Sequence, residues 1–129
     1  MATIRVLFVD DNDDDVFIAT HRLKQAGLNI SAQTVAVRDD LKHAIDSFHP
    51  DIILSDMTLP GFSGLEAFDI AHDSDPDVPF LFLCGCPERC TQQALEKGAF
   101  AIVDKDRAEA LPELINSALL QRGSEHHKS

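Results

Sequence analysis

Acidic side chains follow two apolar segments of the chain, at the points where those segments end. Asp10 and Asp11 come directly after the segment 4–9, and Asp56 comes after the segment 52–55. Both segments are short, apolar and rich in β-branched residues, which predicts buried strands. A single aspartate at a strand end is commonly only a turn or cap residue. The chemical interest of these carboxylates therefore depends on whether they meet.

The order of the predicted elements brings them together. Strand-like and helix-like segments alternate five times with short connections, which predicts a parallel sheet covered by helices on both faces. We expect strands at 4–9, 30–37, 52–55, 79–84 and 100–103, with the second an edge strand. Ligands bind at the carboxyl ends of the strands in such sheets. The aspartates should therefore share one edge with Cys84, which ends the fourth strand, and with Lys105, which follows the fifth.

The helices are predicted from their apolar spacing and their end signals. The helix that ends before Pro50 has apolar residues at i, i+3, i+4 and i+7, and Asp39 is its predicted N-cap. Ser63 is the predicted N-cap of the next helix. Between Asp56 and Ser63, the pair Pro60 and Gly61 predicts a loop.

Carboxylates at one edge of a sheet need a compensating charge. Two unit charges about 4 Å apart repel by about 4 kcal/mol at an effective dielectric of about 20. A few carboxylates with several waters is the ligand pattern of Mg²⁺. Asp11, Asp13 and Asp15 also imitate the start of a calcium loop, but Val16 and Arg22 occupy the positions that need Gly and Glu, so that reading fails. We assign Asp13 to Asp15 to the first turn of a helix, where negative charge is favourable.

Composition narrows the class of protein. With 129 residues and a formal net charge of −11, we expect one domain that binds neither nucleic acid nor an anionic membrane. No apolar run is long enough to span a bilayer. The three cysteines are odd in number and crowded together, which favours a reducing, cytoplasmic compartment. We expect the folded domain to cover 1–121, with 122–129 a flexible tail or the start of a linker.

A family resemblance follows from these motifs taken in order. The motifs are Phe8-Val9-Asp10-Asp11, the segment 51–61 around Asp56, Val78-Pro79, and Gly98-Ala99 followed by Lys105. Together they resemble the receiver domains of two-component response regulators, over about residues 4–120. The resemblance implies a flavodoxin-like, doubly wound α/β fold whose five parallel strands have the order 2-1-3-4-5.

The resemblance also implies a role for each site residue. Asp56 is the expected phosphoacceptor. It would receive the phosphoryl group from a sensor histidine kinase or phosphotransfer protein. Asp11 and Asp56 are expected to bind Mg²⁺ directly, Asp10 through water, and Thr58 through its backbone carbonyl. Lys105 is expected to pair with the phosphoryl oxygens.

The expected activity is a switch and not a turnover enzyme. The signal would pass through the surface formed by the fourth helix, fifth strand and fifth helix. Two copies of the domain could also form a homodimer through this surface. The full-length chain would carry a C-terminal output or sensor domain.

Three positions depart from the family pattern. Cys84 stands where the family has Thr or Ser, and a thiol is a weak hydrogen-bond donor. Asp106 stands where the family has a cis proline, so we expect a trans bond there. Ile102 stands where a switching aromatic residue is common. We therefore expect phosphorylation to be poorly coupled to conformational change.

Other readings stay open. A degenerate receiver would act as a phosphorylation-independent dimerisation or partner-binding module. A phosphohydrolase with an Asp nucleophile would need a second Asp at the position of Thr58. Cys84, Cys86 and Cys90 could form a soft-metal or redox site, but no second cluster supports them. The histidines before residue 73 show no ligand spacing, and we place them on the surface.

Overall fold

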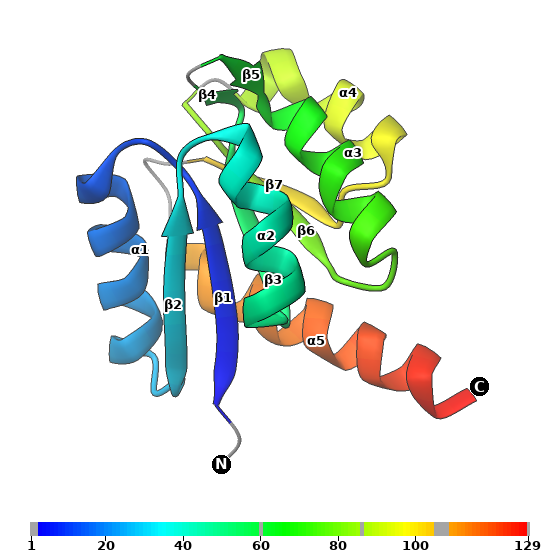
Figure 1. The fold of residues 1–129 in the computed structure, drawn as a ribbon. Coiled ribbons are helices and arrows are strands. Elements are labelled where there is room, and N and C mark those ends of the chain that lie inside the picture. The colour runs from blue at the N-terminus through cyan, green and yellow to red at the C-terminus, as the bar shows by residue number, and fades with distance from the viewer. Residues whose placement is uncertain (1–2, 60, 86, 105–108, 129) are drawn as a thin grey trace.

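The protein folds around one parallel sheet of five strands (Figure 1). The structure, a computed structural model, describes residues 3–59, 61–85, 87–104 and 109–128. The strands of this sheet are β1 (Ile4–Val9), β2 (Ile30–Val35), β3 (Ile52–Asp56), β6 (Phe80–Cys84) and β7 (Ala101–Asp104). Their spatial order is β2-β1-β3-β6-β7. This is the predicted order 2-1-3-4-5, because β6 and β7 are the fourth and fifth strands of the sheet.

The helices cover both faces of the sheet, as predicted. They are α1 (Asp13–Gln25), α2 (Arg38–Phe48), α3 (Gly64–Ser74), α4 (Pro87–Lys97) and α5 (Leu111–Lys128). Buried residues of α2, α3 and α4 belong to one core cluster, and those of α1 and α5 belong to another. The two clusters lie on opposite faces of the sheet, and the sheet separates them.

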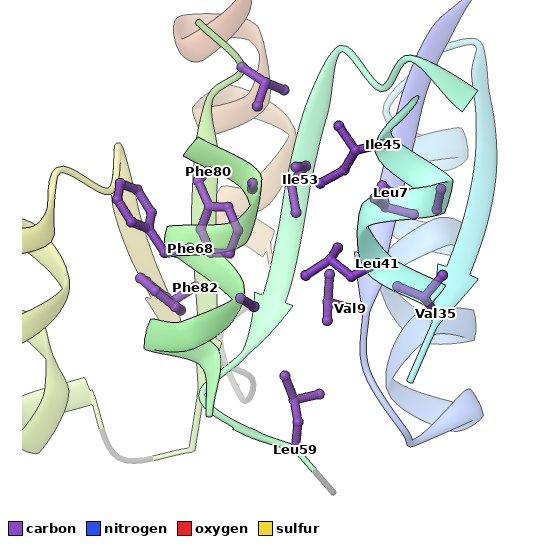
Figure 2. Packing of buried hydrophobic residues seen from close by; sticks show 14 of the residues in the cluster. Leu7, Val9, Val35, Leu41, Ile45, Ile53, Leu59, Phe68, Phe80 and Phe82 are labelled. Carbon is purple, nitrogen blue, oxygen red and sulfur yellow. The ribbon is translucent and has the colours of Figure 1, made fainter. Parts of the chain in front are cut away.

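Alternation along the central strands fills the two clusters. In β1, Leu7 and Val9 point into one cluster, and Val6 and Phe8 point into the other. All four side chains are 0% exposed. Figure 2 shows the larger cluster, in which Leu7 and Val9 lie near Leu41 of α2. Burial of each such side chain stabilises the fold by about 1.5–3 kcal/mol. The packing therefore holds β1 firmly up to its last residue, Val9.

The start of α2 differs from the prediction. Val37, with extended φ and ψ of −126° and 153°, is the N-cap residue and makes no side-chain capping bond. Asp39, the predicted cap, lies inside the first turn with Asp40. Both aspartates still favour the helix, because negative charge near an N-terminus interacts well with the macrodipole. By contrast, Ser63 caps α3 as predicted, accepting a bond from the backbone N–H of Glu66.

The segment after Asp56 is a small hairpin and not only a loop. The strands β4 (Thr58–Leu59) and β5 (Phe62–Ser63) pair antiparallel, with Thr58 opposite Ser63 and Leu59 opposite Phe62. Gly61 between them has a φ of 76°, a conformation suited to glycine. Leu59 and Phe62 are each 7% exposed and join the larger core cluster. The prediction missed the hairpin because two-residue strands carry no period.

The last helix extends past the predicted domain end. The backbone of α5 is helical to Lys128, through most of the segment 122–129 expected to be a tail. The flexibility of that segment stays a prediction. Within the described part of the chain, no helix is both long and apolar enough to cross a membrane.

Candidate functional site

Three carboxylates meet at the carboxyl ends of β1 and β3. These strands are parallel and adjacent, with Val9 opposite Ser55, so the next residues along the strands are Asp10 and Asp56. One carboxylate oxygen from each of Asp10, Asp11 and Asp56 lies within 4.8 Å of the other two. Among the described residues, this is the one group of His, Cys, Asp or Glu side chains that could hold a metal ion. The predicted meeting of these residues is confirmed.

The turn from β1 into α1 is held by the first of these carboxylates. Asp10 is 2% exposed, and its backbone N–H donates to the Val35 carbonyl at 3.0 Å, which continues the β1–β2 pairing. Its Oδ1 accepts a bond from the Asn12 backbone N–H at 2.9 Å. Asn12 Oδ1 in turn accepts from the Asp14 backbone N–H at 2.9 Å and caps α1. Asn12 was not predicted as a cap, although Asn before an acidic first turn is a typical N-cap signal.

An open hollow lies beside this turn, and most of the side chains that line it are acidic. The hollow is lined by Asp11, Asn12, Asp13, Asp14, Asp15 and Asp56. Asp11 is exposed and Asp56 is half-buried, so an ion or a reactive phosphoryl group can reach both from solvent. Asp13, Asp14 and Asp15 lie in the first turn of α1, as predicted.

The backbone around Asp56 is supported from two sides. Ser55, 0% exposed, donates its hydroxyl to the Asp56 carbonyl at 2.9 Å. Gly64 donates its backbone N–H to the Met57 carbonyl at 2.8 Å. A Cβ on Gly64 would stand 2.4 Å from the Asp56 carbonyl oxygen, so the start of α3 can pack here only because residue 64 has no side chain. The importance of Gly64 was not predicted.

The remaining predicted site residues are placed less completely. The backbone of Thr58 belongs to β4, two residues past Asp56. Cys84 is 5% exposed at the end of β6, where it lies opposite Asp104, and its neighbour Leu83 lies opposite Asp56. Lys105 and Asp106 lie outside the described residues, so their predicted roles stay predictions.

The other departures and alternatives can be placed in part. Ile102 of β7 is half-buried and packs against the larger core cluster. Cys86 and the side chain of Cys90 lie outside the described part of the chain, so the soft-metal reading is not tested. The four histidines before residue 73 are exposed, as predicted: His21, His43, His49 and His72.

The donor set suits a hard divalent cation. All the converging ligand atoms are carboxylate oxygens, which Mg²⁺ and Ca²⁺ prefer and which Zn²⁺ uses less often than sulfur or nitrogen. Three carboxylates this close repel one another, and a bound cation removes that repulsion. The residues present therefore fit Mg²⁺.

The fold and the acidic pocket define a flavodoxin-like α/β domain with a cluster of carboxylates, able to hold a cation, at the switch point of its sheet. The family model described as the response regulator receiver domain matches residues 6–116. The chain therefore belongs to the response regulator receiver family of two-component systems.

Curated relatives carry this domain within longer proteins. The chain is 31% identical over 122 residues to the phosphoglycerate transport system transcriptional regulatory protein PgtA of Salmonella typhimurium. The aligned segment covers 92% of this chain and 29% of that protein. It is 32% identical over 111 residues to protein-glutamate methylesterase/protein-glutamine glutaminase 2 of Caulobacter vibrioides, covering 84% of this chain and 32% of that protein. The chain thus spans about a third of these relatives.

Solved structures share the fold at low identity. A receiver domain protein from Methanospirillum hungatei superposes with a TM-score of 0.80 at 24% identity, covering 96% of this chain and 99% of that one. The receiver domain of sensor histidine kinase PA1611 from Pseudomonas aeruginosa has a TM-score of 0.78 at 20% identity, covering 92% and 98%. That structure has a magnesium ion coordinated in its active site cleft.

Proposed function

We propose that this receiver domain accepts a phosphoryl group on Asp56 from a phosphohistidine of a sensor histidine kinase or phosphotransfer protein, with Mg²⁺ in the acidic pocket. The observation that carries the proposal is the approach of Asp10, Asp11 and Asp56 to within 4.8 Å of one another. The magnesium ion in the PA1611 receiver, which has the same fold, supports the choice of metal.

The chain offers several oxygen ligands for that metal, and water would supply the rest. Asp11 and Asp56 would bind it directly, Asp10 through water, and the Thr58 backbone carbonyl would complete the protein ligands. When bound, Mg²⁺ supplies positive charge that offsets the carboxylates and the phosphoryl oxygens. The buried position of Asp10 fits an indirect role, since its Oδ1 already accepts the Asn12 N–H.

The transfer uses Asp56 as the nucleophile. A carboxylate oxygen of Asp56 forms a bond to phosphorus while the bond from phosphorus to the histidine nitrogen breaks. That nitrogen keeps the electron pair, and the proton on the other ring nitrogen makes the departing group a neutral imidazole. The product is an acyl phosphate on Asp56, and Lys105 would pair with its oxygens. The catalytic task is mostly positioning and charge neutralisation, so few residues suffice.

The domain then acts as a switch and not as a turnover enzyme. The signal would pass from the site through β6, whose last residue is Cys84, to the surface formed by α4, β7 and α5. That surface would bind an output partner or a second copy of the domain. The curated relatives are much longer than this chain, which supports an output or sensor domain in the full protein. We expect the protein to act in the cytoplasm.

A second candidate is a receiver that binds its partner without phosphorylation. The observation that favours it is Cys84, a weak hydrogen-bond donor buried where receivers have a hydroxyl group. The half-buried Ile102 on β7 points the same way, because it replaces the family's switching aromatic residue. In this case the acidic pocket would still bind Mg²⁺.

Phosphotransfer measured by intact-protein mass spectrometry tests the proposal. With phosphoramidate and Mg²⁺, we expect the wild type and the control Asp46→Asn, changed on an exposed position of α2, to gain one phosphoryl group. We expect Asp56→Asn to gain none. A gain on Asp56→Asn would refute the assignment.

Two further assays separate the remaining readings. Chemical shifts that change when beryllofluoride and Mg²⁺ are added would favour the switch over the phosphorylation-independent module. Steady turnover of a generic phosphate ester would favour a phosphohydrolase.

A further inference from the structure

The Thr58 carbonyl, a metal ligand under the proposed function, does not lie on the central sheet. It lies on the β4–β5 hairpin, which has only two residue pairs. A two-stranded hairpin is marginally stable by itself. Some other contact must therefore hold this hairpin if the carbonyl is to keep a fixed position beside Asp56.

The inner side of the hairpin is held by the core. Leu59 and Phe62, which face each other across the two strands, are each 7% exposed and belong to the larger core cluster. Apolar contacts of this kind fix the depth of the hairpin, but they are not directional. They leave its orientation relative to α2 and α3 to polar contacts.

A polar bridge joins the hairpin to α2 and α3. The Arg38 guanidinium carbon lies 5.8 Å from the centroid of the Phe62 ring, within the range of a cation–π interaction. The same guanidinium donates through Nη2 to Glu66 Oε2 in the first turn of α3. We call Arg38, Phe62 and Glu66 the Arg38 bridge.

The Arg38 bridge joins three elements at one point. Arg38 is the first residue of α2, Phe62 belongs to β5, and Glu66 belongs to α3. The Glu66 backbone N–H also donates to Ser63 Oγ at 3.2 Å, and Ser63 is the strand partner of Thr58. A continuous set of contacts therefore runs from Arg38 to the backbone of Thr58.

We propose that Arg38 is a positioning residue, which holds the β4–β5 hairpin in place and thereby sets the affinity of the acidic pocket for Mg²⁺. This inference rests on the proposed function. The Arg38 and Glu66 side chains are 52% and 50% exposed, and an exposed ion pair contributes little to the free energy of folding. The effect of Arg38 should therefore appear in metal binding and not in global stability.

The direction of the effect separates positioning from plain electrostatics. Arg38 lies at the carboxyl edge of the sheet, since α2 follows β2, whose last residue is the backbone partner of Asp10. Removal of a positive charge near an acidic pocket would by itself strengthen Mg²⁺ binding. If Arg38 positions a ligand, its removal weakens Mg²⁺ binding instead.

The test compares Arg38→Ala with Lys97→Ala, which removes a different ion pair of α3, between Lys97 and Asp69. Mg²⁺ affinity is measured from the amide shifts of residues 10–14 by NMR, since the chain has no Trp or Tyr for fluorescence. We expect Arg38→Ala to weaken Mg²⁺ binding roughly tenfold, as when a group that orients a metal ligand is lost. We expect Lys97→Ala to leave it unchanged, and neither variant to shift the melting temperature appreciably in metal-free buffer.

Three results would overturn the inference. They are unchanged or tighter Mg²⁺ binding by Arg38→Ala, an equal loss in Lys97→Ala, or a fall in the metal-free melting temperature of Arg38→Ala that accompanies its loss of affinity. Failure of the proposed function looks different, because then the wild type would bind Mg²⁺ no better than Asp11→Asn does.

Discussion

The start of α3 lies directly against Asp56, because a Cβ built on Gly64 would stand 2.4 Å from the carbonyl oxygen of that residue. It would also lie 2.8 Å from the Met57 Cα and 3.0 Å from a ring carbon of Phe82. Two of these three neighbours are backbone atoms, which cannot move aside cheaply. Any side chain at residue 64 must therefore displace Asp56 itself or the helix.

Gly64→Ala should destabilise the protein and impair phosphorylation together. Overpacking of a tight contact costs about 1–3 kcal/mol, and here the displaced atoms belong to the site. Urea unfolding followed by far-UV circular dichroism, with phosphorylation by phosphoramidate, measures both effects. Gly85→Ala is the matched control, because a Cβ there would meet nothing within 4 Å. Equal stability of the two variants would contradict the geometry.

Asp11→Asn should have opposite effects with and without metal. In a chelating buffer the substitution removes repulsion among three carboxylates within 4.8 Å of one another, so the variant should be more stable by about 1 kcal/mol. Added Mg²⁺ should raise the melting temperature of the wild type, because a ligand that binds only the folded state stabilises it. The variant should respond much less.

Asp46→Asn is the matched control for this experiment, because it removes the same charge from an exposed position of α2. It should keep the wild-type response to Mg²⁺. A wild-type melting temperature that does not depend on Mg²⁺ would argue against a metal site.

Ser63→Ala and Asp39→Ala should differ in their cost. Ser63 accepts the Glu66 N–H at the start of α3, and loss of such a cap costs about 1 kcal/mol. Asp39 lies inside the first turn of α2 and makes no capping bond, so only a charge–dipole contribution of about 0.5 kcal/mol is lost. Chemical denaturation of both variants measures the difference. A larger loss from Asp39→Ala would place the N-terminus of α2 later than Arg38.

Cys84→Thr should strengthen the response to phosphorylation. The Cys84 side chain is 5% exposed at the end of β6, and a hydroxyl is a better hydrogen-bond donor than a thiol. Beryllofluoride with Mg²⁺ should therefore shift the amide resonances of residues 85–89 more in Cys84→Thr than in the wild type, with Cys84→Ala showing no gain. Indistinguishable shifts in wild type and Cys84→Thr would show that the thiol does not limit the coupling.

The sheet and its acidic edge were predictable because they depend on patterns with a simple period. Continuous apolar strands such as 52–55 identify a buried parallel sheet, and the carboxyl ends of such strands meet at one edge. That rule alone places Asp10, Asp11 and Asp56 at one edge of the sheet, but not beside one another. The order of the strands came from the family resemblance.

The supporting contacts could not be predicted, because they depend on tertiary geometry. Arg38 and Glu66 are 28 residues apart, and no local pattern relates them. The β4–β5 hairpin has strands of two residues, too short to show alternation. The clash at Gly64 depends on how closely α3 approaches β3. The cap of α2 was predicted at Asp39 because a good capping residue outweighed Val37, which has no capping side chain.

The pairing of β1 with β3 has a consequence for synthesis of the protein. Asp11 and Asp56 are separated in the chain by α1, β2 and α2, and only the parallel pairing of Val9 with Ser55 brings them together. Until β3 has emerged from the ribosome, the nascent chain would thus bind Mg²⁺ no better than aspartates in an unfolded peptide do. The three carboxylates can therefore meet only after β3 has emerged from the ribosome and paired with β1.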